Sequence, residues 1–121
     1  MLVLDTGIIG ELLTLTGCSA SEVLPELIDT YRRESTALLE GLTAAVAAGD
    51  GESMERCAHS LKGNSAILGA VRLPELCDQL QLGGIEGSSA PARMEAIRGA
   101  VSEFIDALET LACDVGPHPV A

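Results

Sequence analysis

The sequence predicts an all-α fold, an up-and-down four-helix bundle with an additional short N-terminal helix. Apolar residues recur every three or four positions along four long segments, as they do on the buried face of a helix. Leu, Ala and Glu favour helices and dominate the composition, whereas aromatic residues, which favour strands, make up only 2%. The connections between the segments are short, which suits antiparallel neighbours.

The length and charge fit one domain. With 121 residues, of which 47% are hydrophobic, the chain can bury a core of Leu, Ile, Val, Ala and Met. The net charge of −11 argues against nucleic acid and against an anionic membrane surface as partners, because both require basic patches. We expect a single domain over residues 1–121, with a tail at about 114–121 frayed by its prolines. Nothing in the sequence demands a dimer, so we expect a monomer.

The four cysteines form no Cys-x-x-Cys pair, so we expect no metal site. Cys57 and Cys77 fall on apolar helical stripes and are predicted to be small buried residues. The chain is not short and cysteine-dense, and neither a signal peptide nor an apolar run of membrane-spanning length is visible. These features predict reduced thiols and a cytoplasmic location.

Residues 3–16 form the predicted short N-terminal helix, with Asp5 at or near its N-cap. Asp5-Thr6-Gly7 also matches the active-site triplet of aspartic proteases, a family that includes small homodimeric members. There the triplet lies well inside a β-rich fold, whereas here it lies five residues from the start of a helical sequence. The context therefore argues against a protease.

Four long helices follow, and Gly, Asp and Pro mark their ends. Gly49 is predicted to end the first and Asp50 to cap the second. Pro25 lies in the first turn of the first helix, and Pro74 opens the third. Glycines and serines over residues 83–89 form a loop that lacks the Gly-Lys-Ser/Thr sequence of a phosphate-binding loop. The predicted helices run from Ser19 or Ser21 to about Ala48, from the cap to about Leu68 or Gly69, from Pro74 to the loop, and from about Ala90 to Ala112.

Apolar side chains at helical spacing are predicted to form the core. The first long helix contributes Val23, Leu24, Leu27, Ile28, Tyr31, Leu38, Leu39, Leu42 and Val46. The third contributes Leu73, Leu76, Cys77, Leu80 and Leu82, and the fourth Met94, Ile97, Val101, Phe104, Ile105, Leu108 and Leu111. Charges off these stripes, such as Arg32, Arg33 and Glu34, are interpreted as solvated.

The second long helix holds one of the two histidines in the chain. At about 100° per residue, His59 points away from the apolar stripe of its helix. Lys62 and Gly63 share its face, so an exposed imidazole is expected beside an ammonium group and a residue without a side chain. A mid-helix glycine costs about 1 kcal/mol relative to alanine, and the close approach of another surface would explain it. The alternatives are a surface histidine without a role and a solvated lysine. The stripe comprises Met54, Cys57, Leu61, Ser65 and Leu68.

At these residues the sequence resembles the histidine-containing phosphotransfer (HPt) domain family. The family motif is histidine, any residue, Leu-Lys-Gly, then small Ser-rich residues and a glycine. Here it reads His59-Ser60-Leu61-Lys62-Gly63-Asn64-Ser65-Ala66-Ile67-Leu68-Gly69. Asn64 departs from the family, which more often has serine at that position. The resemblance covers nearly the whole chain.

The resemblance implies a phosphocarrier without enzymatic turnover of its own. His59 would carry a phosphoryl group to or from a receiver-domain aspartate of a response regulator or hybrid histidine kinase. Lys62 would supply positive charge and Gly63 would give the receiver access. Family members often have a glutamine close to the histidine, where Gln81 falls, although Gln81 also fits an ordinary exposed residue. No cofactor is implied, because Mg²⁺ belongs to the partner receiver. A non-catalytic helical adaptor that binds a receiver or kinase without phosphorylation is the alternative function.

Overall fold

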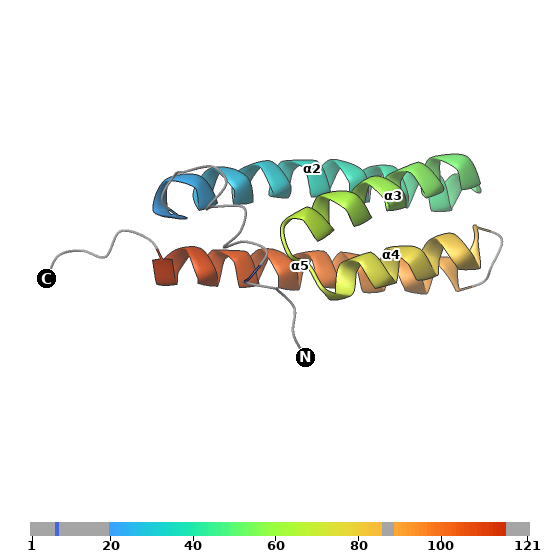
Figure 1. The fold of residues 1–121 in the computed structure, drawn as a ribbon. Coiled ribbons are helices and arrows are strands. Elements are labelled where there is room, and N and C mark those ends of the chain that lie inside the picture. Colours follow the sequence, from blue (N-terminus) through green and yellow to red (C-terminus); the bar gives the residue numbers. More distant parts are fainter. Residues whose placement is uncertain (1–6, 8–19, 86–88, 116–121) are drawn as a thin grey trace, which may run out of the picture.

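The structure is a computed structural model that describes residue 7 and residues 20–85 and 89–115. In these ranges the regular elements are four helices (Figure 1). They are α2 (Ala20–Ala48), α3 (Gly51–Ile67), α4 (Arg72–Gly83) and α5 (Ala90–Val115). The all-α prediction is confirmed. Apart from residue 7, the helix predicted over 3–16 lies outside the described residues, as does the tail from residue 116 onward.

Successive helices run in opposite directions (Figure 1). Both α2 and α4 pack against α3 and against α5, so each helix contacts two neighbours around a shared core. The short connections predicted from the sequence produce this antiparallel order. None of the described helices is long and apolar enough to cross a membrane.

The predicted apolar stripes of α2 and α5 face each other in the core. The rings of Tyr31 and Phe104 meet edge to face, with centroids 5.3 Å apart and planes at 86°. Each fully buried large apolar side chain contributes about 1.5–3 kcal/mol to folding. The buried members are Leu24, Ile28, Tyr31, Leu39 and Leu42 on α2, and Met94, Ile97, Val101, Phe104 and Leu108 on α5.

The prediction that Leu82 faces the core is wrong, because its side chain is 89% exposed. Leu80 is fully buried, and a step of two residues turns the side chain by about 200° around the helix. Leu73 and Cys77 are buried at helical spacing with Leu80. The predicted stripe of α4 had therefore combined two opposite sides of the helix.

The boundary between α2 and α3 is formed as predicted. Gly49 has a φ of +69°, a left-handed conformation that suits glycine, and its N–H donates to the carbonyl of Val46 at 3.3 Å. Asp50 caps α3, where its carboxylate accepts hydrogen bonds from the backbone N–H of Ser53 at 3.2 Å and from the Ser53 hydroxyl at 2.7 Å.

Other helix boundaries differ from the prediction. The helix α4 begins at Arg72, two residues before Pro74. A proline is tolerated in the first turn because the N–H groups there have no acceptor within the helix, so no hydrogen bond is lost. Pro25 lies inside α2, beyond the predicted first turn. The loop after α4 begins at Gly84, since Gly83 still belongs to the helix. The last helix continues to Val115, past the predicted end at about Ala112.

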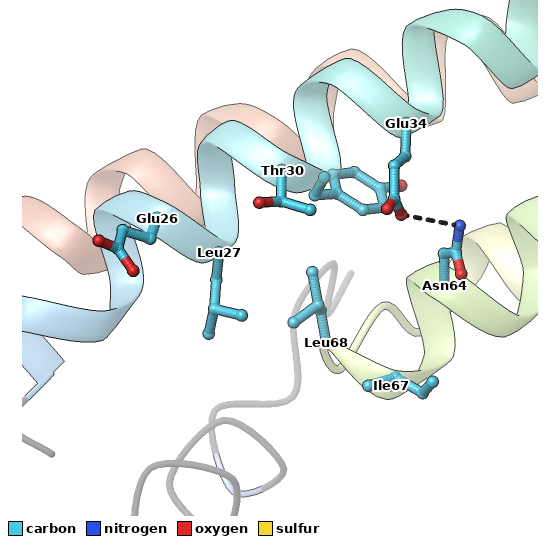
Figure 2. Close-up of a pocket in the computed structure, with 8 residues that line it drawn as sticks. Glu26, Leu27, Thr30, Glu34, Asn64, Ile67 and Leu68 are labelled. Atoms are coloured by element: carbon cyan, nitrogen blue, oxygen red, sulfur yellow. Dashed lines mark hydrogen bonds between the residues drawn. The ribbon is translucent and has the colours of Figure 1, made fainter. Parts of the chain in front are cut away.

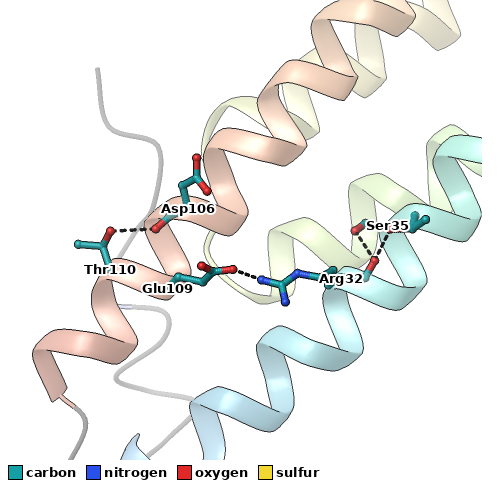
Figure 3. A network of polar contacts seen from close by, with 6 residues as sticks. Arg32, Ser35, Asp106, Glu109 and Thr110 are labelled. Atoms are coloured by element: carbon teal, nitrogen blue, oxygen red, sulfur yellow. Dashed lines mark hydrogen bonds and ion pairs between the residues drawn. The ribbon is translucent and has the colours of Figure 1, made fainter.

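Charged residues on the outside of α2 are paired. Arg32 forms an ion pair with Glu109 of α5 (Figure 3), and Arg33 lies 3.4 Å from Asp29 one turn earlier. Ser35 donates from its hydroxyl to the carbonyl of Arg32 at 3.2 Å. These arginines are therefore not simply solvated, although exposed ion pairs contribute only about 0–1 kcal/mol each.

A buried polar contact joins α2 to α3. The hydroxyl oxygens of Tyr31 and Ser65 lie 2.7 Å apart and share a hydrogen bond. Tyr31 is 2% exposed and Ser65 is fully buried. Burial raises the pKa of Tyr31 to about 12, so the phenol remains neutral and able to donate. This contact fixes which side of α3 faces the core.

Replacing Tyr31 by Phe tests this contact. Tyr31→Phe keeps the aromatic packing on Phe104 but leaves the buried Ser65 hydroxyl without its partner. We expect the free energy of unfolding to fall by about 1–2 kcal/mol in urea titrations followed by circular dichroism. In a Ser65→Ala background the same replacement should cost much less. Equal losses in both backgrounds would show that the hydrogen bond contributes nothing.

The cap of α3 predicts a pH dependence. Hydrogen bonds from the side chain and backbone of Ser53 hold the pKa of Asp50 below its ordinary value of 3.8. A lowered folded-state pKa adds stability above the unfolded-state pKa, and this is lost as the pH falls through the folded value. Asp50→Ala should therefore lower the melting temperature at neutral pH, and the gap to the wild type should narrow as the pH falls below 3.8. A gap that stays constant into acid would contradict this account.

Candidate functional site

His59 lies at the middle of α3 with its side chain exposed, as the helical period predicts. The side chains on the opposite side of α3 are buried. Because side chains about half a turn apart project in opposite directions, burial of that side leaves the imidazole in solvent. The buried residues of α3 are Met54, Ala58, Leu61 and Ser65.

An open groove of about 650 Å³ lies beside His59, between α2 and α3. Much of its lining is small or apolar, and Glu34 adds a carboxylate. The imidazole therefore stands at the edge of a surface that another protein can contact. The lining residues are Glu34, Ala37 and Leu38 from α2, and His59, Ser60, Gly63, Asn64 and Ile67 from α3.

Gly63 lines this groove and has open space beside it. A β-carbon at this position would meet no packed neighbour within 4 Å. Gly41 shows the contrast, because a β-carbon there would lie 3.0 Å from the sulfur of Cys57. Close packing of α2 on α3 thus explains Gly41, whereas packing inside the described fold gives no reason for Gly63. A need for access to His59 is consistent with the geometry.

Lys62 forms an ion pair that the helical pattern does not predict. Its Nζ lies 2.7 Å from Oδ1 of Asp78 in α4. The two side chains are 38% and 47% exposed, so water reaches the pair. The ammonium group is therefore engaged across the contact between α3 and α4, one helical turn from His59.

Gln81 is half-buried on α4. The helices α3 and α4 are antiparallel (Figure 1). Because Lys62 pairs with Asp78, the residue one turn after Asp78 is expected to lie level with His59. Gln81 does not line the groove, which lies on the other flank of α3. The imidazole thus stands between a groove on the α2 side and Gln81 with the ion pair on the α4 side.

A second hollow of about 310 Å³ continues between α2 and α3 away from His59 (Figure 2). Asn64 donates from Nδ2 to Oε2 of Glu34 at 3.3 Å, and both residues line the groove and the hollow. Asn64, the departure from the family motif, therefore bridges the two helices where these spaces meet. Glu34, interpreted from the sequence as solvated, has a defined partner.

Cys57 and Cys77, two of the four cysteines, are free thiols. Cys77 is buried, as predicted, and burial raises its pKa to about 12, with nearby Asp78 acting in the same direction. Its thiol is therefore protonated and a poor nucleophile. Cys57 is only half-buried, contrary to the prediction, because it lies at the edge of the stripe. Among the described residues, no cluster of His, Cys, Asp and Glu has the arrangement of a metal site.

Comparisons with known proteins identify the family. The Hpt domain matches residues 26–112, which is most of the chain, and this protein belongs to the Hpt domain family. It is also similar to the crystal structure of histidine-containing phosphotransfer protein B (HptB) from Pseudomonas aeruginosa PAO1. The sequence identity is 28% and the TM-score 0.80, over 92% of this chain and 95% of that chain. A comparison with curated proteins found no match. The family recognised in the sequence is confirmed.

The contact of Asp78 with Lys62 and the bridge from Glu34 to Asn64 were not predicted from the sequence. These contacts span 16 and 30 positions of the chain. Periodicity assigns residues to helix faces but does not fix how far one helix is shifted along another. The one available signal was that Asp78 lies a single turn before Gln81, which was already a candidate.

The open surroundings of Gly63 generate a prediction with two opposite effects. Gly63→Gln should raise the melting temperature, because glycine is the poorer helix former by about 1 kcal/mol. It should slow phosphoryl transfer from a phosphorylated receiver, because the longer side chain enters the groove. Gly63→Ala is the matched control, with a similar gain in stability and a smaller loss of rate. Transfer by Gly63→Gln at or above the wild-type rate would show that position 63 has no role in access.

Proposed function

We propose that this protein is a histidine phosphotransfer protein of a two-component phosphorelay. His59 carries the phosphoryl group to or from a receiver-domain aspartate of a response regulator or hybrid histidine kinase. The observation that carries the proposal is the exposed imidazole at the middle of α3, within the family motif and at the edge of an open groove. The match to the Hpt domain and the likeness to HptB support it.

The chemistry needs a nucleophile and local positive charge. A neutral imidazole has a nitrogen lone pair that attacks phosphorus. The nitrogen–phosphorus bond forms while the bond from phosphorus to the aspartyl oxygen breaks, and the carboxylate leaves. Passing the group on is the reverse reaction. Negative charge on the phosphoryl oxygens makes positioning and electrostatics the main sources of catalysis. Lys62, one turn along the same face, is the nearby cation.

In this proposal, the groups needed for phosphoryl transfer come from two proteins. The receiver supplies Mg²⁺ and the acidic pocket that holds it, and this chain needs no cofactor of its own. His59 supplies the nucleophile, Lys62 the charge and Gly63 the access, while Gln81 faces the partner at the level of the imidazole. The chain acts as a monomeric carrier. We also propose for it the predicted architecture, a single domain formed by an up-and-down four-helix bundle with a short N-terminal helix.

The alternative function is a helical adaptor that binds a receiver or kinase without phosphorylation. An adaptor would use the same groove, but it would require neither an exposed imidazole nor an unobstructed glycine beside it. The protease hypothesis has no support in the described residues, because their helices do not provide the β-rich setting of that triplet.

Replacing His59 separates the carrier from the adaptor. The wild type should take label from a phosphorylated receiver, and the label should be lost in acid, as phosphohistidine is. His59→Gln should take none, while its free energy of unfolding stays within about 0.5 kcal/mol of the wild type because the site is exposed. His118→Gln removes the other histidine and should label normally. Wild-type labelling of His59→Gln would refute the site, and receiver binding without label in the wild type would favour the adaptor.

A further inference from the structure

The ion pair between Lys62 and Asp78 lies one helical turn from His59 along α3. Its 2.7 Å contact joins α3 to α4, and the side chains remain 38% and 47% exposed. Exposed ion pairs are weak, because water and salt screen them and two flexible side chains must be held. The ammonium group can therefore leave Asp78 when a stronger anion comes within reach.

The direction of the side chains gives Lys62 access to that anion. In a helix, long side chains project back over the preceding turn, so Lys62 reaches toward the turn that carries His59. Arg56 lies one turn on the other side of His59, and its guanidinium donates to Ser53 at 3.1 Å, away from the imidazole. Lys62 is also the single lysine in a chain of net charge −11. Lys62 is thus the cation on α3 that is well placed to reach a phosphoryl group on His59, and Lys62 is already paired with Asp78.

We infer that Asp78 is a positioning residue that competes with the phosphoryl group for Lys62. The inference rests on the proposed function and adds a regulator to the same site. Without phosphate, Asp78 holds the ammonium against α4. A phosphoryl group carries about −1.5 to −2 charge at neutral pH, so it draws the ammonium from a single carboxylate. The competition reduces the stabilisation that Lys62 gives phosphohistidine, so it shortens the life of the phosphorylated state.

If Asp78 had a purely structural role, the half-life of phosphohistidine would change in the opposite direction when Asp78 is replaced. If the ion pair only held α4 against α3, its loss would loosen the site and shorten the life of phosphohistidine. Under competition, Asp78→Asn frees Lys62 for the phosphoryl group. The ammonium then disfavours protonation of the phosphorylated imidazole, which hydrolysis requires, and the half-life lengthens. The sign of the change separates the two roles.

The test uses phosphoramidate, a phosphoryl donor that needs no partner protein. The phosphorus–nitrogen bond of the donor breaks, a bond to the His59 nitrogen forms, and ammonia leaves. After removal of the donor, ³¹P NMR follows hydrolysis of the full-length protein. We expect the half-life of phosphohistidine to lengthen about two- to five-fold in Asp78→Asn, the range of a screened ion pair. Lys62→Gln should shorten it, and the difference made by Asp78→Asn should shrink at high salt.

Three further variants keep the test specific. Adding Asp78→Asn to Lys62→Gln should change nothing, because Asp78 acts through the lysine. Asp78→Glu restores the carboxylate and should return the half-life toward the wild-type value. Glu75→Gln removes an equal charge from an exposed position on α4, farther from His59, and should leave the half-life unchanged. If Asp78→Asn does not fold, Asp78→Ser removes the same charge.

The outcomes distinguish this inference from the function on which it rests. A labelled wild type with an equal or shorter half-life in Asp78→Asn overturns the inference alone. A longer half-life that persists without Lys62 also overturns it, because Asp78 would then act directly on the phosphoryl group. A wild type that takes no label at His59 overturns both proposals.

Discussion

The burial of one side of α3 is the constraint on which the presentation of His59 depends. Leu61 and Ser65 are completely enclosed, and the hydroxyl of Ser65 is bonded to Tyr31 of α2. A rotation of α3 about its axis would expose the apolar side and break that buried hydrogen bond, so the helix has one stable orientation. At 3.6 residues per turn, that orientation leaves His59 in solvent. The buried core therefore positions the imidazole.

The two flanks of α3 have different chemical roles in this account. Toward α2 the surface is open, with Gly63 unobstructed and a carboxylate, Glu34, tied to Asn64. Toward α4 the surface holds charge, with Lys62 engaged by Asp78. Under the proposed function, a receiver approaches over the first flank while the second adjusts the electrostatics at the imidazole.

The features that follow from periodicity and capping could be predicted from the sequence, and those that follow from contacts between helices could not. Helical spacing placed His59 outside the core, and the cap at Asp50 was found from its residue type. The partner of Lys62 depends on how far α4 is shifted along α3, which no local pattern encodes. The prediction for Leu82 was wrong for a different reason: Leu82 is apolar, but it lies about 200° around α4 from the buried Leu80.

The most direct test of the central claim is to map the phosphoryl group on the wild-type chain. A phosphorylated receiver would be mixed with the protein, and the product analysed by ³¹P NMR and by tandem mass spectrometry at neutral pH. The account predicts one phosphoryl group per chain, bonded to a nitrogen of His59 and lost in acid. An acid-stable phosphate on a hydroxyl group, or a group bonded to any residue other than His59, would contradict it.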